Sequence, residues 1–291
     1  MTDRLYSARH LKEIIDSYSF EITKSLGQNF LIDGNIVRNI VSQAGVTEDD
    51  YVLEVGPGIG TLTEELSMRA KKVVSVEIDK NLIPILDTTL GKYSNIEVVH
   101  GDILDIDINS LIQEEMNGGP VKVVANLPYY VTTPIIGRFL EEDLDVESLT
   151  IMVQKEVAQR MVAGEGSKTY GSLSVFVNFY SDPEIVLDVP RTVFMPQPNV
   201  DSAVIRMNMK EELPEVDRSK FFKLVKSAFS KRRKTLVNAV SSYGFTIEKA
   251  EVRQALESLN MDTRVRAEAL SIEEFIGLCK ALPALEMEEE N

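Results

Sequence analysis

Short apolar runs alternate with helix-like stretches through the first two thirds of the chain. Each run is rich in Val and Ile, as buried strands usually are. Strands that alternate with helices are typical of a doubly wound α/β sheet, in which most strands are parallel. The pattern predicts strands at 51–55, 72–78, 96–100, 121–125 and 149–153, a closing pair of strands at 173–180 and 203–209, and helices at 61–69 and 135–140.

A polar segment that contains a proline, Lys210–Arg218, separates this part of the chain from a helical remainder. We therefore expect an α/β domain over residues 1–209 and a small all-helical domain over residues 210–291. Ser271, followed by Glu273 and Glu274, fits an N-cap with acidic residues in the first helical turn. The helices expected here are Lys220–Val240, Ile247–Asn260 and Ser271–Leu282.

The amino-acid composition is that of a globular protein and excludes several other classes. The chain has 291 residues, of which 44% are hydrophobic and 26% charged, as in an ordinary globular protein. No apolar run approaches the roughly 20 residues of a membrane-spanning helix, and the N-terminus has no signal- or transit-peptide pattern. The single cysteine, Cys279, excludes an internal disulfide and a multi-cysteine metal site. We expect a cytoplasmic protein that holds no metal.

The net charge of −15 would by itself argue against a nucleic-acid partner, because phosphate binding needs a basic surface. The average hides a basic cluster, however, since Lys226 and the run Lys231–Lys234 lie within nine residues. We expect the segment Ser227–Val240 to be helical, and four consecutive cations cannot share one helical face. At least two of them should reach solvent, and the plain interpretation is a solvated face.

A glycine-rich turn joins the strand expected at 51–55 to the helix expected at 61–69. It reads Glu-Val-Gly-Pro-Gly-Ile-Gly-Thr over residues 54–61. Glycine lets the backbone turn sharply and approach a ligand without a clash at Cβ. The spacing is G-x-G-x-G and not the dinucleotide pattern G-x-G-x-x-G, because residue 61 is threonine. A tight turn that binds nothing is the alternative.

Polar residues follow three further strands at the points where they end. Glu77 closes the strand expected at 72–78, Asp102 follows the strand at 96–100, and Asn126 follows the strand at 121–125. Ligands of such sheets bind outside the carboxyl ends of the strands, so these side chains should converge on one crevice. An acid about twenty residues after a glycine loop can accept both hydroxyls of a ribose. A nucleoside cofactor is favoured, and both NAD and S-adenosylmethionine remain candidates.

The tetrapeptide Asn126-Leu127-Pro128-Tyr129 carries the most specific chemistry. An Asn side chain can accept a hydrogen bond from an exocyclic amine, and a tyrosine offers a flat face on which a base can stack. Such a site would hold the amino group of adenine or cytosine toward an electrophile. An ordinary proline-containing turn with a packed tyrosine fits the four residues equally well.

Motifs along nearly the whole chain resemble one family. They run in order from about Lys24 to Leu282, and together they are similar to the S-adenosylmethionine-dependent rRNA adenine N6,N6-dimethyltransferases, specifically the small-subunit group. The resemblance implies a Rossmann-like methyltransferase domain followed by a small helical RNA-binding domain. The motifs are KSLGQNFL, EVGPGIGTLT, VEIDKNL, GDILD, ANLPYYVTTPII, MVQKEVAQRM, VFMPQPNVDSAV, AFSKRRKTLVNAV and TRVRAEALSIEEF.

The resemblance also implies roles for individual residues. Glu77 would hold the cofactor's ribose, Asp102 its adenine amine, and Asn126 with the Leu127 carbonyl would bind the target amine. The implied cofactor-binding residues are Asn29, Leu31, Gly56, Glu77, Asp102, Ile103 and Asn126. The implied residues around the target base are Asn126, Leu127, Pro128, Tyr129 and Phe194, with Tyr129 and Phe194 on its two faces. The implied rRNA contacts are Lys231, Arg232, Arg233 and Lys234.

The implied reaction is dimethylation of two adjacent adenosines in a hairpin loop near the 3′ end of small-subunit rRNA. The implied partner is the assembling small ribosomal subunit, and we expect a monomer that also acts in subunit biogenesis. Rivals are a large-subunit resistance methyltransferase, which typically has Ile at the position of Leu127, and a DNA adenine methyltransferase. A non-enzymatic assembly factor and a small-molecule methyltransferase are rivals from other classes.

Overall fold

The computed structural model describes residues 4–23 and 26–286 of the chain. These residues form two compact units, which we call the N-terminal and the C-terminal unit. The N-terminal unit comprises Met1–Ala158 and Pro183–Met209, and the C-terminal unit comprises Gln159–Asp182 and Lys210–Asn291. The chain crosses between the units at Met209–Lys210, but the expected division into residues 1–209 and 210–291 leaves out the segment Gln159–Asp182. The chain also crosses twice earlier, so the segment Gln159–Asp182 belongs with the C-terminal helices.

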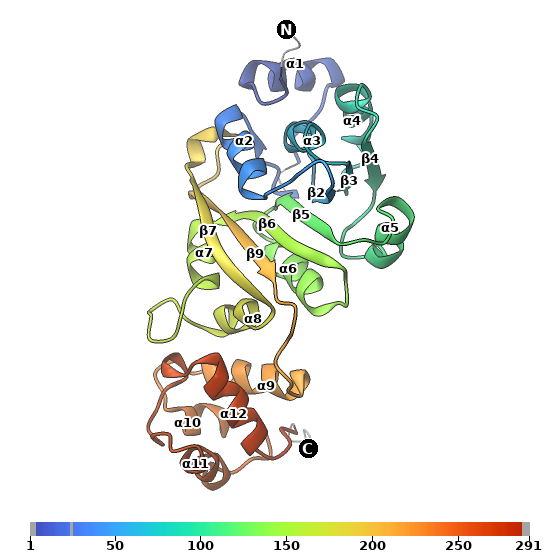
Figure 1. Ribbon diagram of the computed structural model, residues 1–291. Helices are drawn as coiled ribbons and strands as arrows, with labels where there is room; N and C mark the ends of the chain where they lie inside the picture. The colour runs from blue at the N-terminus through green and yellow to red at the C-terminus, as the bar shows by residue number, and fades with distance from the viewer. Residues whose placement is uncertain (1–3, 24–25, 287–291) are drawn as a thin grey trace, which may run out of the picture. The chain divides into compact units, whose positions relative to one another are not determined.

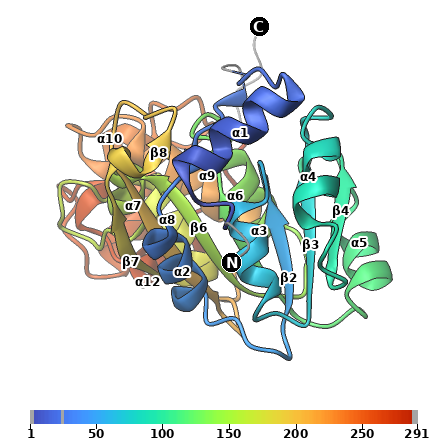
Figure 2. The same ribbon diagram turned by 90° about the horizontal axis from the view of Figure 1, so that it is seen from above.

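The N-terminal unit is built on one sheet with the strand order β4-β3-β2-β5-β6-β9-β7. The pairs β2–β3, β3–β4, β2–β5 and β5–β6 are parallel, and β9 runs antiparallel to β6. In both views β4 lies toward one edge of this sheet and β7 toward the other (Figure 1; Figure 2). The strands are β2 (Tyr51–Val55), β3 (Lys72–Glu77), β4 (Ile96–His100), β5 (Val121–Asn126), β6 (Val146–Gln154), β7 (Ser181–Val189) and β9 (Ser202–Met209).

The strand register brings the carboxyl ends of the central strands together. Val55 lies opposite both Val76 and Ala125, and Glu77 lies opposite His100. The parallel α/β arrangement and the convergence of these strand ends are therefore confirmed. The strands β1 (Phe30–Leu31), β7 and β8 (Phe194–Met195) were not predicted, because β1 and β8 are only two residues long and β7 carries polar residues and a proline.

Helices of the N-terminal unit follow most of the parallel strands. The first helix, α1, buries Leu11 and Ile14 in a hydrophobic cluster with Ile59 and with Ile85 of α4. The side chain of Asp33 caps α2 by accepting hydrogen bonds from the backbone N–H groups of its first turn. The helices are α1 (Ala8–Tyr18), α2 (Gly34–Gln43), α3 (Thr61–Ser67), α4 (Ile83–Leu90), α5 (Ile108–Glu115) and α6 (Thr132–Glu141), with α7 (Lys155–Met161) at the crossing and the 3₁₀ helix η2 (Arg191–Val193) before β8.

The C-terminal unit is all-helical. Its helices are α8 (Ser172–Tyr180), α9 (Arg218–Phe229), α10 (Leu236–Val240), α11 (Lys249–Ser258) and α12 (Ile272–Ala281), with the 3₁₀ helix η3 (Ala267–Ala269). The predicted capping residue Ser271 accepts a hydrogen bond from the N–H of Glu274 and completes a capping box. No helix in residues 4–23 and 26–286 is both long and apolar enough to cross a membrane.

The prediction of a strand at 173–180 was wrong, because this segment is the helix α8. Its Val and Phe residues favour a strand locally, but short apolar runs do not distinguish a strand from a buried helix. Phe176 and Tyr180, four residues apart, meet at 5.4 Å between ring centroids, as side chains on one helical face do. Phe179 packs against Phe221 and Phe222 of α9, so tertiary packing of aromatic rings decides the structure.

The prediction of one continuous helix over Lys220–Val240 was also wrong. The chain leaves α9 after Phe229 and re-enters a helix at Leu236, and the basic run Lys231–Lys234 lies in the turn between them. Ser230 donates its hydroxyl proton to the carbonyl of Ser227, which competes with continued helical hydrogen bonding. The four cations are therefore not spread around a helix, because the run lies in a turn.

Candidate active site

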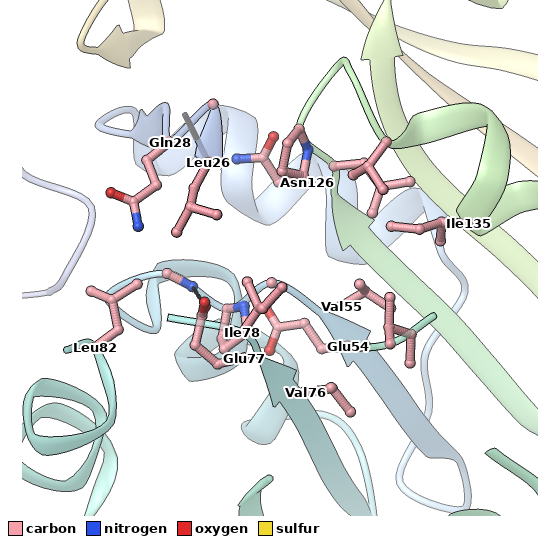
Figure 3. A pocket seen from close by; sticks show the side chains of 18 of the residues that line it. Leu26, Gln28, Glu54, Val55, Val76, Glu77, Ile78, Leu82, Asn126 and Ile135 are labelled. Carbon is pink, nitrogen blue, oxygen red and sulfur yellow. Dashed lines mark hydrogen bonds between the residues drawn. The ribbon is translucent and has the colours of Figure 1, made fainter. Parts of the chain in front are cut away.

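A cavity of about 290 Å³ lies at the carboxyl ends of β2, β3 and β5. Its walls come from the glycine loop, the ends of these strands, the loop after β4, the segment after β5 and the chain just before β1. Glu77 and Leu82 lie on one wall, whereas Asn126 and Leu26 lie on the opposite wall (Figure 3). Ten predicted site residues line it: Asn29, Leu31, Gly56, Glu77, Asp102, Ile103, Asn126, Leu127, Pro128 and Tyr129.

The glycine loop forms the floor of the cavity. Gly56 has φ +70°, and a Cβ built on it would meet no atom within 4 Å. Gly60 has φ +89°, and a Cβ there would lie 2.9 Å from Leu90. The two glycines are therefore needed for different reasons. Gly60 permits tight packing of the loop on α4, whereas Gly56 leaves open space beside its backbone where a ligand can approach.

Glu77 is the acid at the end of β3, and it is only 4% exposed. Its Oε1 accepts a hydrogen bond from the N–H of Asp79 at 2.8 Å, and its Oε2 accepts one from the N–H of Gly58 at 3.2 Å. Burial raises the pKa of Glu77 to about 7, although both backbone hydrogen bonds oppose this rise. The carboxyl group is thus fixed in orientation and exchanges its proton near neutral pH.

Glu54 also lines the cavity, although it was not among the residues predicted for the site. It lies in β2, is 1% exposed, and accepts a hydrogen bond at Oε2 from the hydroxyl of Ser75 at 2.7 Å. Burial, together with the neighbouring charge of Glu77, raises its pKa to about 7, although the hydrogen bond from Ser75 opposes this rise. An acid inside an otherwise apolar strand was the available signal, because charged groups are seldom fully buried without a function or a partner.

The loop after β4 carries Asp102 and Ile103. Asp102 accepts a hydrogen bond at Oδ1 from the N–H of Leu104 at 2.9 Å, and Ile103 is buried. Arg138 of α6 holds this loop, because its guanidinium donates to the carbonyl oxygens of Ile103 and Ile106. The cavity therefore has an apolar wall beside an acid whose Oδ2 accepts no hydrogen bond from a described residue.

Asn126 ends β5 and presents an acceptor to the cavity. Its Nδ2 donates to the carbonyl oxygen of Asn29 at 3.1 Å, which leaves Oδ1 without a donor among the described residues. Leu127 is buried, and its carbonyl oxygen likewise receives no hydrogen bond in the described part of the chain. The next carbonyl, that of Pro128, is occupied by the hydroxyl of Thr132 at 3.1 Å. Two neighbouring acceptors are therefore free to take an N–H group.

Tyr129 is half-buried beside these acceptors. Its hydroxyl forms a 2.7 Å hydrogen bond with the hydroxyl of Ser202 in β9. Burial raises the pKa of Tyr129 above its usual value, so the phenol stays neutral at physiological pH. The hydrogen bond at the hydroxyl fixes the orientation of the Tyr129 ring, so the ring can serve as a stacking surface for a base.

The segment before β1 closes the cavity from the N-terminal side. Gln28 donates from Nε2 to Asp79 Oδ2 at 2.8 Å and accepts at Oε1 from the N–H of Thr23 at 2.9 Å. Asn29 donates to the carbonyl of Gly27 at 2.8 Å. Gln28 is a site residue that the sequence analysis missed, since no strand-end pattern marks it. Lys24 and Ser25, the first residues of the KSLGQNFL motif, lie outside the described residues.

Phe194 is not brought to the cavity with the other predicted residues. It lies in β8, pairs with Leu31, and is 4% exposed within a hydrophobic cluster that includes Val37 of α2. Its ring therefore packs in the core instead of lining the cavity. Phe194 still contributes to the site indirectly, because it positions Leu31 through the two-stranded pairing.

The basic run lies in the C-terminal unit, on a surface that three loops share. The N–H of Leu236 donates to the carbonyl of Val265, and the N–H of Gly166 donates to that of Glu268. Arg232 pairs with Glu268 at 3.3 Å, and Lys231 donates to Ser242. Four exposed cations on these loops form no ion pair within residues 4–23 and 26–286: Lys168, Arg233, Lys234 and Arg266. Of the acidic tail, only Glu286 is described.

The family model and the most similar known proteins indicate the same family. The family model described as ribosomal RNA adenine dimethylase matches residues 19–283. Proteins named ribosomal RNA small subunit methyltransferase A are close relatives. The one from Alkaliphilus oremlandii is 55% identical over 94% of this chain and 96% of its own length. The one from Clostridioides difficile is 54% identical over 94% and 95%, respectively.

Solved structures agree with the sequence relatives. A dimethyladenosine transferase from Plasmodium falciparum superimposes with a TM-score of 0.74 at 27% identity, covering 86% of this chain and 95% of its own. The 23S rRNA methyltransferase ErmE superimposes with a TM-score of 0.66 at 28% identity, covering 87% and 99%. These likenesses confirm the predicted Rossmann-like methyltransferase fold. With a family match that spans both units, the chain belongs to the ribosomal RNA adenine dimethylase family.

Proposed function

We propose that this protein transfers methyl groups from S-adenosylmethionine to the N6 amines of two adjacent adenosines in small-subunit rRNA. The observation that carries the proposal is the pair of free acceptors, Asn126 Oδ1 and the Leu127 carbonyl, in the same cavity as Glu77. The names of the relatives support the small subunit as substrate, since those at 54–55% identity act on small-subunit rRNA by name. ErmE, named for 23S rRNA, is only 28% identical.

The residues of the cavity fit the cofactor. Glu77 can accept hydrogen bonds from both ribose hydroxyls, while Asp102 can accept from an adenine amine with Ile103 against the ring. The open space beside Gly56 admits the methionine portion, with Asn29 and Leu31 nearby in the lining. When bound, S-adenosylmethionine supplies an electrophilic methyl group on a positively charged sulfur.

Asn126 and Leu127 would then prepare the nucleophile. The lone pair of an aromatic amine is delocalised into the ring, so the free amine attacks poorly. Its two N–H groups can donate to Asn126 Oδ1 and to the Leu127 carbonyl, which favours a more tetrahedral nitrogen with a localised lone pair. Stacking of the base on Tyr129 fixes its plane, and this positioning supplies a large part of the rate.

The reaction needs no strong base. As the nitrogen forms its bond to the methyl carbon, the bond from that carbon to the cofactor's sulfur would break, and the electron pair would stay on sulfur. The nitrogen would then carry a positive charge and readily lose a proton to water. After the first transfer one N–H remains, so the monomethylated amine can still donate to one of the two acceptors. The second transfer therefore uses the same residues, with the first methyl group placed beside the other acceptor.

The loop surface of the C-terminal unit supports a folded RNA as the substrate. Lys231–Lys234, together with Lys168, Arg264 and Arg266, brings positive charge from distant parts of the sequence to adjoining loops of a chain whose net charge is −15. Such a local patch can contact phosphates, while the overall charge limits indiscriminate binding. We propose that the protein acts as a monomer on the rRNA of an assembling small subunit.

The test is methyl transfer from labelled S-adenosylmethionine to ribosomal subunits that lack the modification. We expect N6,N6-dimethyladenosine at two adjacent positions in small-subunit rRNA, read by mass analysis of the digested RNA. Label found only in large-subunit rRNA would contradict the proposal and favour a resistance-type activity. Tight binding of the small subunit without any transfer would also contradict it and would favour a non-enzymatic assembly factor.

A further inference from the structure

Tyr130 is unusual among the large hydrophobic side chains of this protein. It is 62% exposed, whereas the other exposed large hydrophobic residues within the described part of the chain are 40–47% exposed. It nevertheless lines the cavity that contains Asn126 and Glu77. A large aromatic ring that lies both at a ligand cavity and in solvent has a surface available for a second molecule.

Tyr130 differs sharply from its neighbour Tyr129. The hydroxyl of Tyr129 is tied to Ser202, and its ring is half-buried next to the free acceptors. The hydroxyl of Tyr130 has no hydrogen-bond partner within residues 4–23 and 26–286. The first tyrosine is therefore built into the wall of the cavity, while the second projects from its mouth.

The ring of Tyr130 is supported although it is exposed. A Cβ built on Gly27 would lie 3.5 Å from Cδ1 and Cε1 of Tyr130 and 3.3 Å from the Cβ of Pro128. The ring thus lies next to the space that a side chain at residue 27 would fill, beside Pro128, and the Gly27 carbonyl is itself fixed by the side chain of Asn29. Support of this kind lowers the entropic cost of ordering the ring when a partner stacks on it.

We propose that Tyr130 stacks on the nucleobase next to the adenosine held at Tyr129. Single-stranded RNA is recognised mainly by stacking of unpaired bases on aromatic side chains. Tyr129 and Tyr130 both line the cavity, one in its wall and one exposed to solvent, so the base next to the target lies within reach of the second ring. The inference rests on the proposed function. In it, Tyr130 holds the neighbouring adenosine by stacking while the first adenosine is bound at Tyr129.

A single-tryptophan variant tests this directly, because the natural chain contains no tryptophan. In Y130W the only indole lies at the proposed stacking position, where contact with a base quenches its fluorescence. We expect quenching when unmodified small subunits or an adenosine-containing hairpin RNA are added, and none when S-adenosylhomocysteine is added alone. The control Y18W carries its indole on α1, away from the cavity lining, and should not respond to RNA.

Kinetic measurements distinguish stacking of Tyr130 on an RNA base from contact of Tyr130 with the bound cofactor. Loss of one base–aromatic stack corresponds to a drop of roughly 5- to 150-fold in kcat/KM for RNA. We expect this drop in Y130A and Y130L, near-normal activity in Y130F, and an unchanged Kd for S-adenosylhomocysteine in all three. An equal loss of cofactor affinity in Y130A, or full activity of Y130A on RNA, would overturn the role of Tyr130. Absence of transfer by the wild-type protein would instead refute the proposed function itself.

Discussion

Lowering the pH from 8 to 6 should weaken nucleoside binding through Glu77. Ribose hydroxyls donate hydrogen bonds, so the ionised carboxylate is the form that binds them. Burial raises the pKa of Glu77 to about 7, and therefore roughly nine tenths of it is ionised at pH 8 and roughly one tenth at pH 6. Affinity should fall about tenfold over this range, which corresponds to about 1.4 kcal/mol.

Calorimetric titration with 5′-deoxy-5′-methylthioadenosine measures this effect cleanly. The ligand carries the ribose diol and the adenine ring but has no group that titrates between pH 6 and 8. Glu54 also has a pKa of about 7, so E54Q serves as the matched control and should keep the pH dependence. E77Q should bind weakly with a flat profile. A flat profile for the wild type, or an unchanged slope in E77Q, would refute the role of Glu77.

Three further predictions concern stability and binding. The pKa of Glu54 is higher in the folded chain than the ordinary 4.5, so its ionisation destabilises the fold as pH rises above about 4.5. At pH 8, E54Q should therefore raise the free energy of unfolding by up to about 3 kcal/mol, which thermal melts would show as a higher Tm. At pH 4 the Tm of E54Q should equal that of the wild type. G56A should lose cofactor binding in calorimetry and melt at a somewhat lower temperature, because alanine is strained at φ +70°. G60A should melt lower still, because its methyl group is strained at φ +89° and also meets Leu90. The double variant R233A/K234A should weaken RNA binding in salt titrations, reduce the slope of log K against log salt by about 1.5, and leave cofactor affinity unchanged.

Much of the N-terminal unit could be predicted because parallel strands have a strong local signal. Runs of Val and Ile bounded by polar turns marked β2, β3, β4 and β5, and the geometry of a parallel sheet brings their ends together. Glu77, Asp102 and Asn126 were reached in this way, from their positions at strand ends. The remaining assignments at the cavity came from the family resemblance.

Other features depend on contacts between distant residues, which no local pattern reveals. Helix α8 forms because Phe179 packs on the aromatic residues of α9, although its own sequence favours a strand. The turn at Lys231–Lys234 is fixed by hydrogen bonds to distant loops, such as that from Leu236 to Val265. The bond between Gln28 and Asp79 joins residues 51 positions apart in the sequence.

The most direct test of the account is methyl transfer by N126A to unmodified small subunits. Removing the acceptor Oδ1 should lower kcat for both transfers by about 100-fold or more, as loss of one oriented polar group in an active site does. The binding of S-adenosylhomocysteine should stay within a few fold of wild type, because Glu77 and Asp102 remain. N35A, which removes an exposed asparagine on α2, is the matched control and should be fully active. Wild-type rates of dimethyladenosine formation by N126A would contradict the central claim that Asn126 orients the target amine.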